Sequence, residues 1–193
     1  MKIIFLILII LITPFSLSWA QTVQGNSLYD YQTILTDQDG KQMDFNVFQG
    51  HPVVVSMFYA SCDYSCPLFI DVLKKMDSKL DSKIRDKIRI LLISFDPAHD
   101  TSVVLYKLAK QHHLDLSRWK LVFPSKNHVR DLAALLNYTY RPLPDGGFNH
   151  TSAITLLDER GVILHSEEGL QNAANSIVEI LKKQNFPFMK GTL

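Results

Sequence analysis

The stretch Tyr59-Ala60-Ser61-Cys62-Asp63-Tyr64-Ser65-Cys66-Pro67 contains the only two cysteines of the 193-residue chain, four positions apart. The apolar run at residues 53–58 precedes it, and a short β-branched run of this kind is typical of a strand buried on both faces in a parallel sheet. Apolar residues at helical spacing follow it as far as Leu80, and Pro67 suits the first turn of that helix. The sequence therefore predicts both thiols at a strand-to-helix junction, where the helix dipole favours thiolate.

The spacing of the two cysteines differs from that of a thioredoxin-type dithiol, which has two intervening residues rather than three. In a regular helical turn, Cys62 and Cys66 would have Cβ atoms about 5–6 Å apart, whereas a disulfide needs roughly 3.5–4.5 Å. A soft metal ion bound to each thiolate at about 2.3 Å tolerates the wider separation. A metal site, a structural disulfide and two buried thiols all remain open at this point.

The first twenty residues have the features of a secretory signal. Lys2 supplies the positive charge, residues 3–12 are apolar, and Ser18-Trp19-Ala20 provides small residues for cleavage after Ala20. Ten apolar residues are too few to span a bilayer, which takes about 20. We therefore expect an exported, periplasmic bacterial protein; the alternative is that residues 1–20 remain as an N-terminal inner-membrane anchor.

The mature chain, residues 21–193, is long enough for one domain with a core of its own, and no linker divides it. Removal of Lys2 leaves 19 basic and 19 acidic residues, so we expect neither a nucleic-acid nor an anionic-membrane partner. The periplasm is kept oxidising, and a reduced cysteine pair there needs a metal or a dedicated reductase.

Strand and helix patterns alternate along the rest of the chain. An N-terminal hairpin is predicted from residues 31–36 and 43–47 around the turn Asp37-Gln38-Asp39-Gly40. A second hairpin is predicted from residues 153–157 and 162–165. The other predicted strands are residues 51–58, 88–95 and 119–123, with a short extended segment at 138–141; residues 81–87 and 142–147 are predicted as connections. The predicted helices are the one that ends near Leu80, one capped by Asp100 or Thr101 that reaches His112, one capped by Ser125 that reaches Asn137, and residues 170–183. This order is that of an α/β, thioredoxin-like fold with an N-terminal β-hairpin extension.

Four motifs in this order resemble those of the Sco/SenC family of copper chaperones. They are the C-x-x-x-C-P dithiol at Cys62 and Cys66, Ser94-Phe95-Asp96-Pro97-Ala98-His99-Asp100-Thr101, Arg118-Trp119-Lys120-Leu121, and Gly147-Phe148-Asn149-His150-Thr151-Ser152. The resemblance covers about residues 28–185. Asp63 and Ser61 depart from residues common in the family, and the family's usual membrane anchor is here short enough to be cleaved.

The resemblance implies that Cys62, Cys66 and His150 bind one copper ion. Thiolates favour Cu(I), and the imidazole helps to accommodate Cu(II). It also implies that Asp96 and Asp100 orient the ligands or contact a partner; helix capping and solvation of a strand end are the alternatives for these two residues. The implied function is delivery of copper to the dinuclear copper centre of a respiratory oxidase, with that oxidase's copper-site subunit as the partner. A periplasmic copper donor or thiol reductase is a further partner, and no small-molecule substrate is expected.

A thiol–disulfide oxidoreductase is the second function class, in which Cys62 and Cys66 cycle between dithiol and disulfide. His150 distinguishes the two, because reductase chemistry does not need it. A thiol peroxidase is disfavoured, since Asp63 beside the first thiol opposes thiolate formation. Of the other histidines, His112 and His113 are expected at a helix C-terminus, and four are expected on the surface: His51, His99, His128 and His165.

Overall fold

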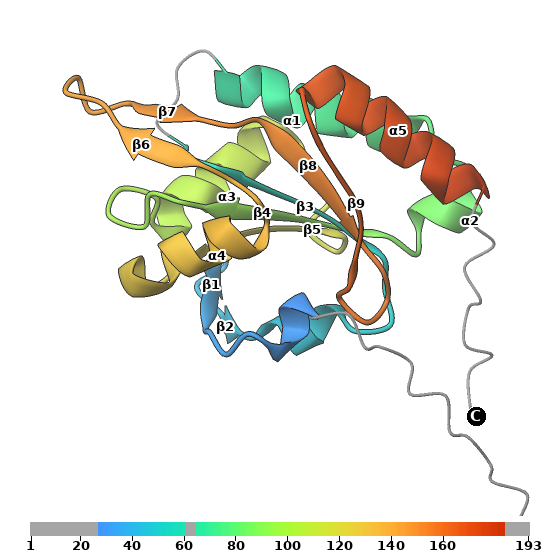
Figure 1. Ribbon diagram of the computed structural model, residues 1–193, viewed down its shortest axis with the longest axis horizontal. Coiled ribbons are helices and arrows are strands. Elements are labelled where there is room, and N and C mark those ends of the chain that lie inside the picture. The colour runs from blue at the N-terminus through green and yellow to red at the C-terminus, as the bar shows by residue number, and fades with distance from the viewer. Residues whose placement is uncertain (1–26, 61–64, 184–193) are drawn as a thin grey trace, which may run out of the picture.

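The computed structural model describes residues 27–60 and 65–183 of the chain. Within these residues, seven strands form one mixed sheet in the order β2-β1-β5-β4-β3-β8-β9, and β6 pairs with β7 in a separate two-stranded ribbon (Figure 1). The strands are β1 (Leu35–Asp37), β2 (Gln42–Met43), β3 (Val53–Phe58), β4 (Arg89–Ser94), β5 (Trp119–Pro124), β6 (Tyr140–Pro142), β7 (Phe148–His150), β8 (Ala153–Leu157) and β9 (Ile163–Glu168). The α-helices are α1 (Ser65–Ser78), α2 (Ser82–Arg85), α3 (Ser102–Gln111), α4 (Val129–Leu135) and α5 (Leu170–Lys183), and the 3₁₀ helices are η1 (Leu28–Asp30), η2 (Phe45–Phe48) and η3 (Lys126–His128).

The central strand β3 is buried along its whole length. It runs parallel to β4, with Val55 opposite Leu91, and antiparallel to β8, with Val55 opposite Thr155. Its side chains alternate between two cores: Val54 and Phe58 enter one, and Val55 enters the other. The predicted strand buried on both faces is therefore confirmed, and the physical reason is that helices cover both sides of the sheet.

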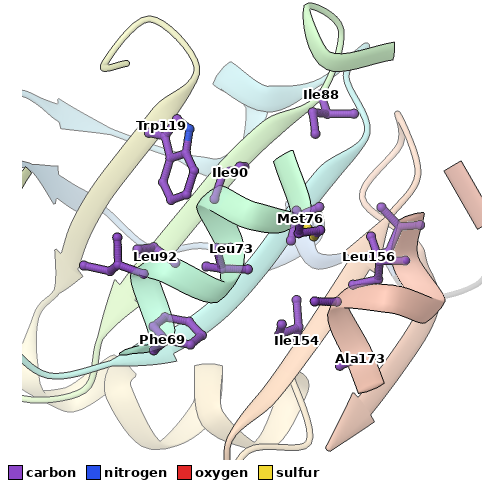
Figure 2. Close-up of a cluster of buried hydrophobic side chains, with 14 of the residues drawn as sticks. Phe69, Leu73, Met76, Ile88, Ile90, Leu92, Trp119, Ile154, Leu156 and Ala173 are labelled. Carbon is purple, nitrogen blue, oxygen red and sulfur yellow. The ribbon is translucent and has the colours of Figure 1, made fainter. Parts of the chain in front are cut away.

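Helices α1, α3 and α5 cover one face of the sheet, with α1 and α5 packed together (Figure 1). Figure 2 shows Phe69, Leu73 and Met76 of α1 beside Ile90 and Leu92 of β4. The spacing of these three α1 residues places them on one apolar stripe, which accounts for the way the helix lies on the sheet. Helix α4 and the two N-terminal 3₁₀ helices cover the other face.

The predicted N-terminal hairpin is present but shorter than expected. Strand β1 pairs antiparallel with β2, and in the turn between them the Gly40 N–H donates to the Asp37 carbonyl over 3.0 Å. Gly40 has φ +76°, a conformation that favours glycine. Strand β1 also pairs antiparallel with β5, which attaches the hairpin to the edge of the sheet. The rest of the predicted second strand forms the 3₁₀ helix η2 instead.

Two local predictions differ from the structure, and the structure decides between the two predicted caps of α3. The segment at residues 81–87 contains the short helix α2, because the Asp81 side chain caps it by accepting from the Ile84 N–H. Thr101, and not Asp100, is the N-cap of α3. Ser125 makes no side-chain capping bond, and the chain after it forms η3 before α4 begins.

The C-terminal part follows the prediction closely. Strands β8 and β9 form the expected hairpin, although β9 extends to Glu168, and helix α5 has the predicted bounds. The short extended segment near residue 140 becomes β6, which pairs with an unpredicted strand, β7. Among the described residues, no helix has both the length and the apolar character needed to cross a membrane.

Candidate metal centre

The cysteine segment connects β3 to α1, as predicted. Cys62 lies outside the described residues, and of Cys66 the structure describes the backbone, in the first turn of α1. The surroundings of the segment are therefore defined by the residues on either side of it. Ala60 is the last described residue before it, and the side chains of α1 are described from Leu68 onward.

His150 reaches this junction from a distant part of the chain. It ends β7, and β8 begins three residues later beside the C-terminal end of β3, where the Ser56 hydroxyl donates to the Ala153 carbonyl over 2.5 Å. The imidazole meets the Tyr59 ring edge-on, with centroids 5.8 Å apart and planes at 87°. It also lines a cavity of about 20 Å³ together with Phe69 of α1. His150 thus lies beside residues on both sides of the cysteine segment.

Among the described residues, His150 makes two polar contacts through its ring, and Nδ1 makes both of them. The Tyr138 hydroxyl lies 2.7 Å from this nitrogen, and the Thr151 carbonyl oxygen also lies 2.7 Å from it. A carbonyl oxygen only accepts hydrogen bonds, so Nδ1 carries the proton and donates it. The lone pair is then on Nε2, the form in which a neutral imidazole binds a metal. The half-buried His150 side chain therefore fits the role of a metal ligand.

Aromatic rings surround His150 on its protein side. Phe95, the residue after β4, lies 5.3 Å from the imidazole between ring centroids, and the Tyr138 ring lies 5.9 Å away in a nearly parallel plane. Phe148 contacts both Phe95 and Tyr59. These packed rings limit how far the imidazole can rotate. Sequence reasoning missed Tyr138 as part of the site, and no local signal marks it, because its contact with His150 depends on the pairing of β6 with β7.

Asp100 is completely buried and is bonded to the chain that leads into the cysteine segment. Its Oδ2 atom accepts from the Ala60 N–H at 2.9 Å and from the Ser94 hydroxyl at 2.5 Å. Burial raises the pKa of the Asp100 carboxyl above its ordinary value, an effect partly offset by the hydrogen bond from Ser94. Asp100 thus holds Ala60 in place instead of capping α3.

Asp96 makes a different set of contacts. Its N–H donates to Ser94 Oγ over 3.0 Å, and its carboxylate lies 2.8 Å from His99 Nδ1. Sequence reasoning placed His99 on the surface, and its side chain is 72% exposed, but it is paired with Asp96. The two acidic residues are therefore not equivalent, because Asp100 contacts the residue before the cysteine segment and Asp96 contacts a neighbour on its own loop.

The remaining histidines lie away from His150. His112 is the C-cap of α3 and His113 follows it with φ 52°, so the prediction that this pair lies at a helix C-terminus is confirmed. His51, His128 and His165 bond to Lys87, Tyr31 and Glu167 respectively. In residues 27–60 and 65–183, no cluster of three or more His, Cys, Asp or Glu side chains is placed to hold a metal; the predicted ligand Cys62 is outside these residues.

Comparison with known proteins gives a family and a fold. A model of the SCO1/SenC family matches residues 22–184. The SCO1 protein homolog of Bacillus subtilis (strain 168) is 24% identical over 143 residues, which are 70% of this chain and 72% of that protein.

Solved structures show the same fold. A structure of Bradyrhizobium japonicum ScoI with copper bound has a TM-score of 0.64 and 22% identity, and the match covers 78% of this chain and 95% of that one. A structure of BsSco, described as a member of the Sco family of cytochrome c oxidase assembly proteins with a disulfide switch, has a TM-score of 0.67 and 22% identity over 82% of this chain and 95% of that one. These likenesses confirm the thioredoxin-like fold.

Proposed function

Because the chain belongs to the SCO1/SenC family, we propose that it binds copper and delivers it to the dinuclear copper centre of a respiratory oxidase. The copper-bound structure of Bradyrhizobium japonicum ScoI and the oxidase-assembly role stated for BsSco support this proposal. The protein acts in the periplasm after export, and residues 1–20 are its signal sequence. The copper-site subunit of the oxidase is its partner.

The proposed ligands are Cys62, Cys66 and His150. Two thiolates select Cu(I), and an imidazole nitrogen allows the same site to hold Cu(II). A site with three protein ligands leaves a position open, through which a ligand of the recipient protein can attack the metal. Delivery is therefore a ligand exchange, in which the recipient's donors replace these three one at a time.

The position of His150 is the observation that carries the proposal. Its ring contacts Tyr59, three residues before Cys62, and shares a cavity with Phe69, three residues after Cys66. Its protonated Nδ1 is bonded to the protein, which leaves Nε2 as the nitrogen available to a metal. A histidine that served only as a surface residue would need neither this position nor this arrangement of hydrogen bonds.

The test is copper binding by the mature protein, residues 21–193, and by its His150→Ala variant. We expect the reduced parent to take up one copper ion per chain and to show a sulfur-to-copper charge-transfer band with Cu(II). His150→Ala should weaken Cu(II) binding by at least about 100-fold, since even the outer hydrogen-bond partners of metal ligands are worth about 10–100-fold. The dithiol of the variant should still oxidise, because that reaction needs only the cysteines.

His165→Ala is the matched control, because His165 is also a hydrogen-bonded histidine on a strand, in β9, paired with Glu167. Its copper stoichiometry and spectrum should equal those of the parent. If His150→Ala bound copper like the parent while Cys66→Ser abolished thiol–disulfide exchange, copper delivery would be rejected in favour of the reductase function.

The reductase function is supported by the position of Cys66 in the first turn of a 14-residue helix. The positive end of the helix dipole lowers the pKa of a thiol placed there and so favours the reactive thiolate. In that reaction the dithiol of Cys62 and Cys66 would reduce a disulfide of the recipient and become a disulfide itself. His150 has no part in these steps, so the comparison above separates the two functions.

A further inference from the structure

We propose that Tyr138 is a positioning residue that, together with the Thr151 carbonyl, keeps the His150 imidazole in the orientation needed for metal binding. For its consequence on copper the inference rests on the proposed function. Its effect on the imidazole can be measured without any metal.

The hydrogen bonds at Nδ1 favour one tautomer. The Thr151 carbonyl oxygen can only accept, whereas the Tyr138 hydroxyl can accept or donate, and each lies 2.7 Å from Nδ1. Both contacts are satisfied together only when Nδ1 carries the proton and shares it between the two oxygens. Rotation of the ring by 180° would place a carbon where Nδ1 now lies and would lose both bonds. His150 is therefore held in one of the two ring orientations, with Nε2 free to bind.

The hydroxyl of Tyr138 is itself held in a fixed position. Tyr138 is only 4% exposed, and its ring packs against Phe95. Its N–H donates to the Ala133 carbonyl over 2.7 Å, and the N–H of the preceding Asn137 donates to the Ala134 carbonyl over 3.1 Å. This pair of bonds is a Schellman motif, which ends α4 with Asn137 in the left-handed conformation (φ 52°). The end of α4 thus fixes where the Tyr138 side chain meets His150.

A ligand held in this way loses little conformational freedom when the metal binds, so less of the binding free energy is spent on ordering it. Partners of this kind also set which nitrogen of a ligating histidine faces the metal. If Tyr138 only filled space in the core, phenylalanine would serve equally well, because the ring contacts do not involve the hydroxyl. The function of Tyr138 therefore depends on a single oxygen atom.

The first measurement is the tautomer of His150 in the metal-free mature protein, from the ¹⁵N chemical shifts of its ring. We expect both proteins to carry the proton on Nδ1, because the Thr151 carbonyl still accepts it in Tyr138→Phe, but we expect the Nδ1 chemical shift of the variant to move, since one of the two oxygens bonded to Nδ1 is lost. Tyr31→Phe is the matched control, since the Tyr31 hydroxyl also lies 2.7 Å from a histidine Nδ1, that of His128 beside α4. It should leave the His150 signals unchanged.

The second measurement is Cu(II) affinity. We expect Tyr138→Phe to bind about tenfold more weakly than the parent, at the lower end of the effect of removing such a partner because the Thr151 carbonyl remains. Tyr31→Phe should bind as the parent does. A metal-free parent with its proton on Nε2 would overturn the inference, and so would a Tyr138→Phe variant equal to the parent in both the Nδ1 chemical shift and the affinity for Cu(II).

Failure of the proposed function would look different. In that case copper binding by the parent would not depend on His150, while the Nδ1 chemical shift and its response to Tyr138→Phe would still be as expected. The role of Tyr138 in holding the imidazole would then stand, and its link to copper would not.

Discussion

At the scale of single residues, the chemistry depends on two part-buried polar contacts, each made by a buried side chain, between residues distant in the sequence. Asp100 accepts a hydrogen bond from Ala60, 40 positions away, and the Tyr138 hydroxyl bonds to His150 on the neighbouring strand. Buried acceptors of this kind are costly to remove, because the donor they leave behind has lost its bond with water as well. They therefore hold the ends of the candidate site more firmly than surface contacts could.

Asp100 gives a prediction at this scale. Asp100→Ala removes the acceptor of both the Ala60 N–H and the Ser94 hydroxyl, and we expect it to lower the free energy of unfolding by about 1–3 kcal/mol. Asp100→Asn keeps one acceptor oxygen and should cost less. Urea unfolding of the three proteins at pH 7 measures both costs, and equal stability of all three would contradict the assigned contacts.

The pH dependence of the same comparison tests the charge of Asp100. Burial raises the pKa of Asp100 in the folded state above its ordinary value of 3.8, which the unfolded chain keeps. At a pH between the unfolded and the folded pKa, Asp100 therefore carries a proton in the folded state that it has released in the unfolded chain. The stability of the parent relative to Asp100→Asn should therefore increase as the pH falls from 7 towards 4. A relative stability that decreased over this range would show that the pKa is lowered instead.

At the scale of elements, the important feature is how α4 passes into the β6–β7 ribbon. Sequence periodicity predicted one helix from Ser125 to Asn137, whereas the structure has η3, the helix α4 and a Schellman motif. The left-handed residue Asn137 turns the chain so that Tyr138 enters the core and β6 can pair with β7. The end of α4 and the position of His150 are thus coupled.

Asn137 can be tested by two substitutions with opposite backbone preferences. Asn137→Val places a β-branched residue in the left-handed region and should lower the free energy of unfolding by about 1–2 kcal/mol or more, while Asn137→Gly should be neutral or stabilising. Thermal or urea unfolding measures both. Because the strain acts on the residue before Tyr138, we also expect Asn137→Val to weaken Cu(II) binding. Identical behaviour of the two variants would show that the motif does not position Tyr138.

At the scale of the whole molecule, two hydrophobic cores lie on opposite faces of one sheet and share its central strands. Val54 and Ile90 belong to one core, and their neighbours Val55 and Leu91 belong to the other. Neither core can lose its strands without exposing the other. The two faces should therefore unfold together.

The prediction at this scale is a single cooperative transition of the mature protein. Trp119, 2% exposed in the core beneath α1, is the one tryptophan of the sequence after Ala20, so its fluorescence reports on one face of the sheet. We expect the urea midpoints from Trp119 fluorescence and far-UV circular dichroism to coincide. Two separated midpoints would show that the cores unfold independently.

The sequence by itself determined the elements whose residues are patterned locally. The apolar run at residues 53–58 predicted β3, the spacing within residues 170–183 predicted α5, and Pro67 after a dithiol placed the cysteines at a strand-to-helix junction. These predictions succeeded because burial on one or two faces leaves its period in the chain itself. Helix ends were predicted less well, because caps depend on single hydrogen bonds that several neighbouring polar residues could make.

The tertiary structure alone decided which side chains meet. No local pattern links Asp100 to Ala60 or Tyr138 to His150, and nothing in the sequence of β7 marks it as a strand. The Asp100 contact arises because β4 runs parallel to β3 and brings the loop after β4 to the end of β3, and the Tyr138 contact arises because β6 pairs with β7. His150 reaches the same end because β8 pairs antiparallel with β3, which brings the residues just before β8 to the point where the cysteine segment begins. Such pairings join positions about a hundred residues apart, and the free energy that selects them comes from the two shared cores and not from the segments themselves.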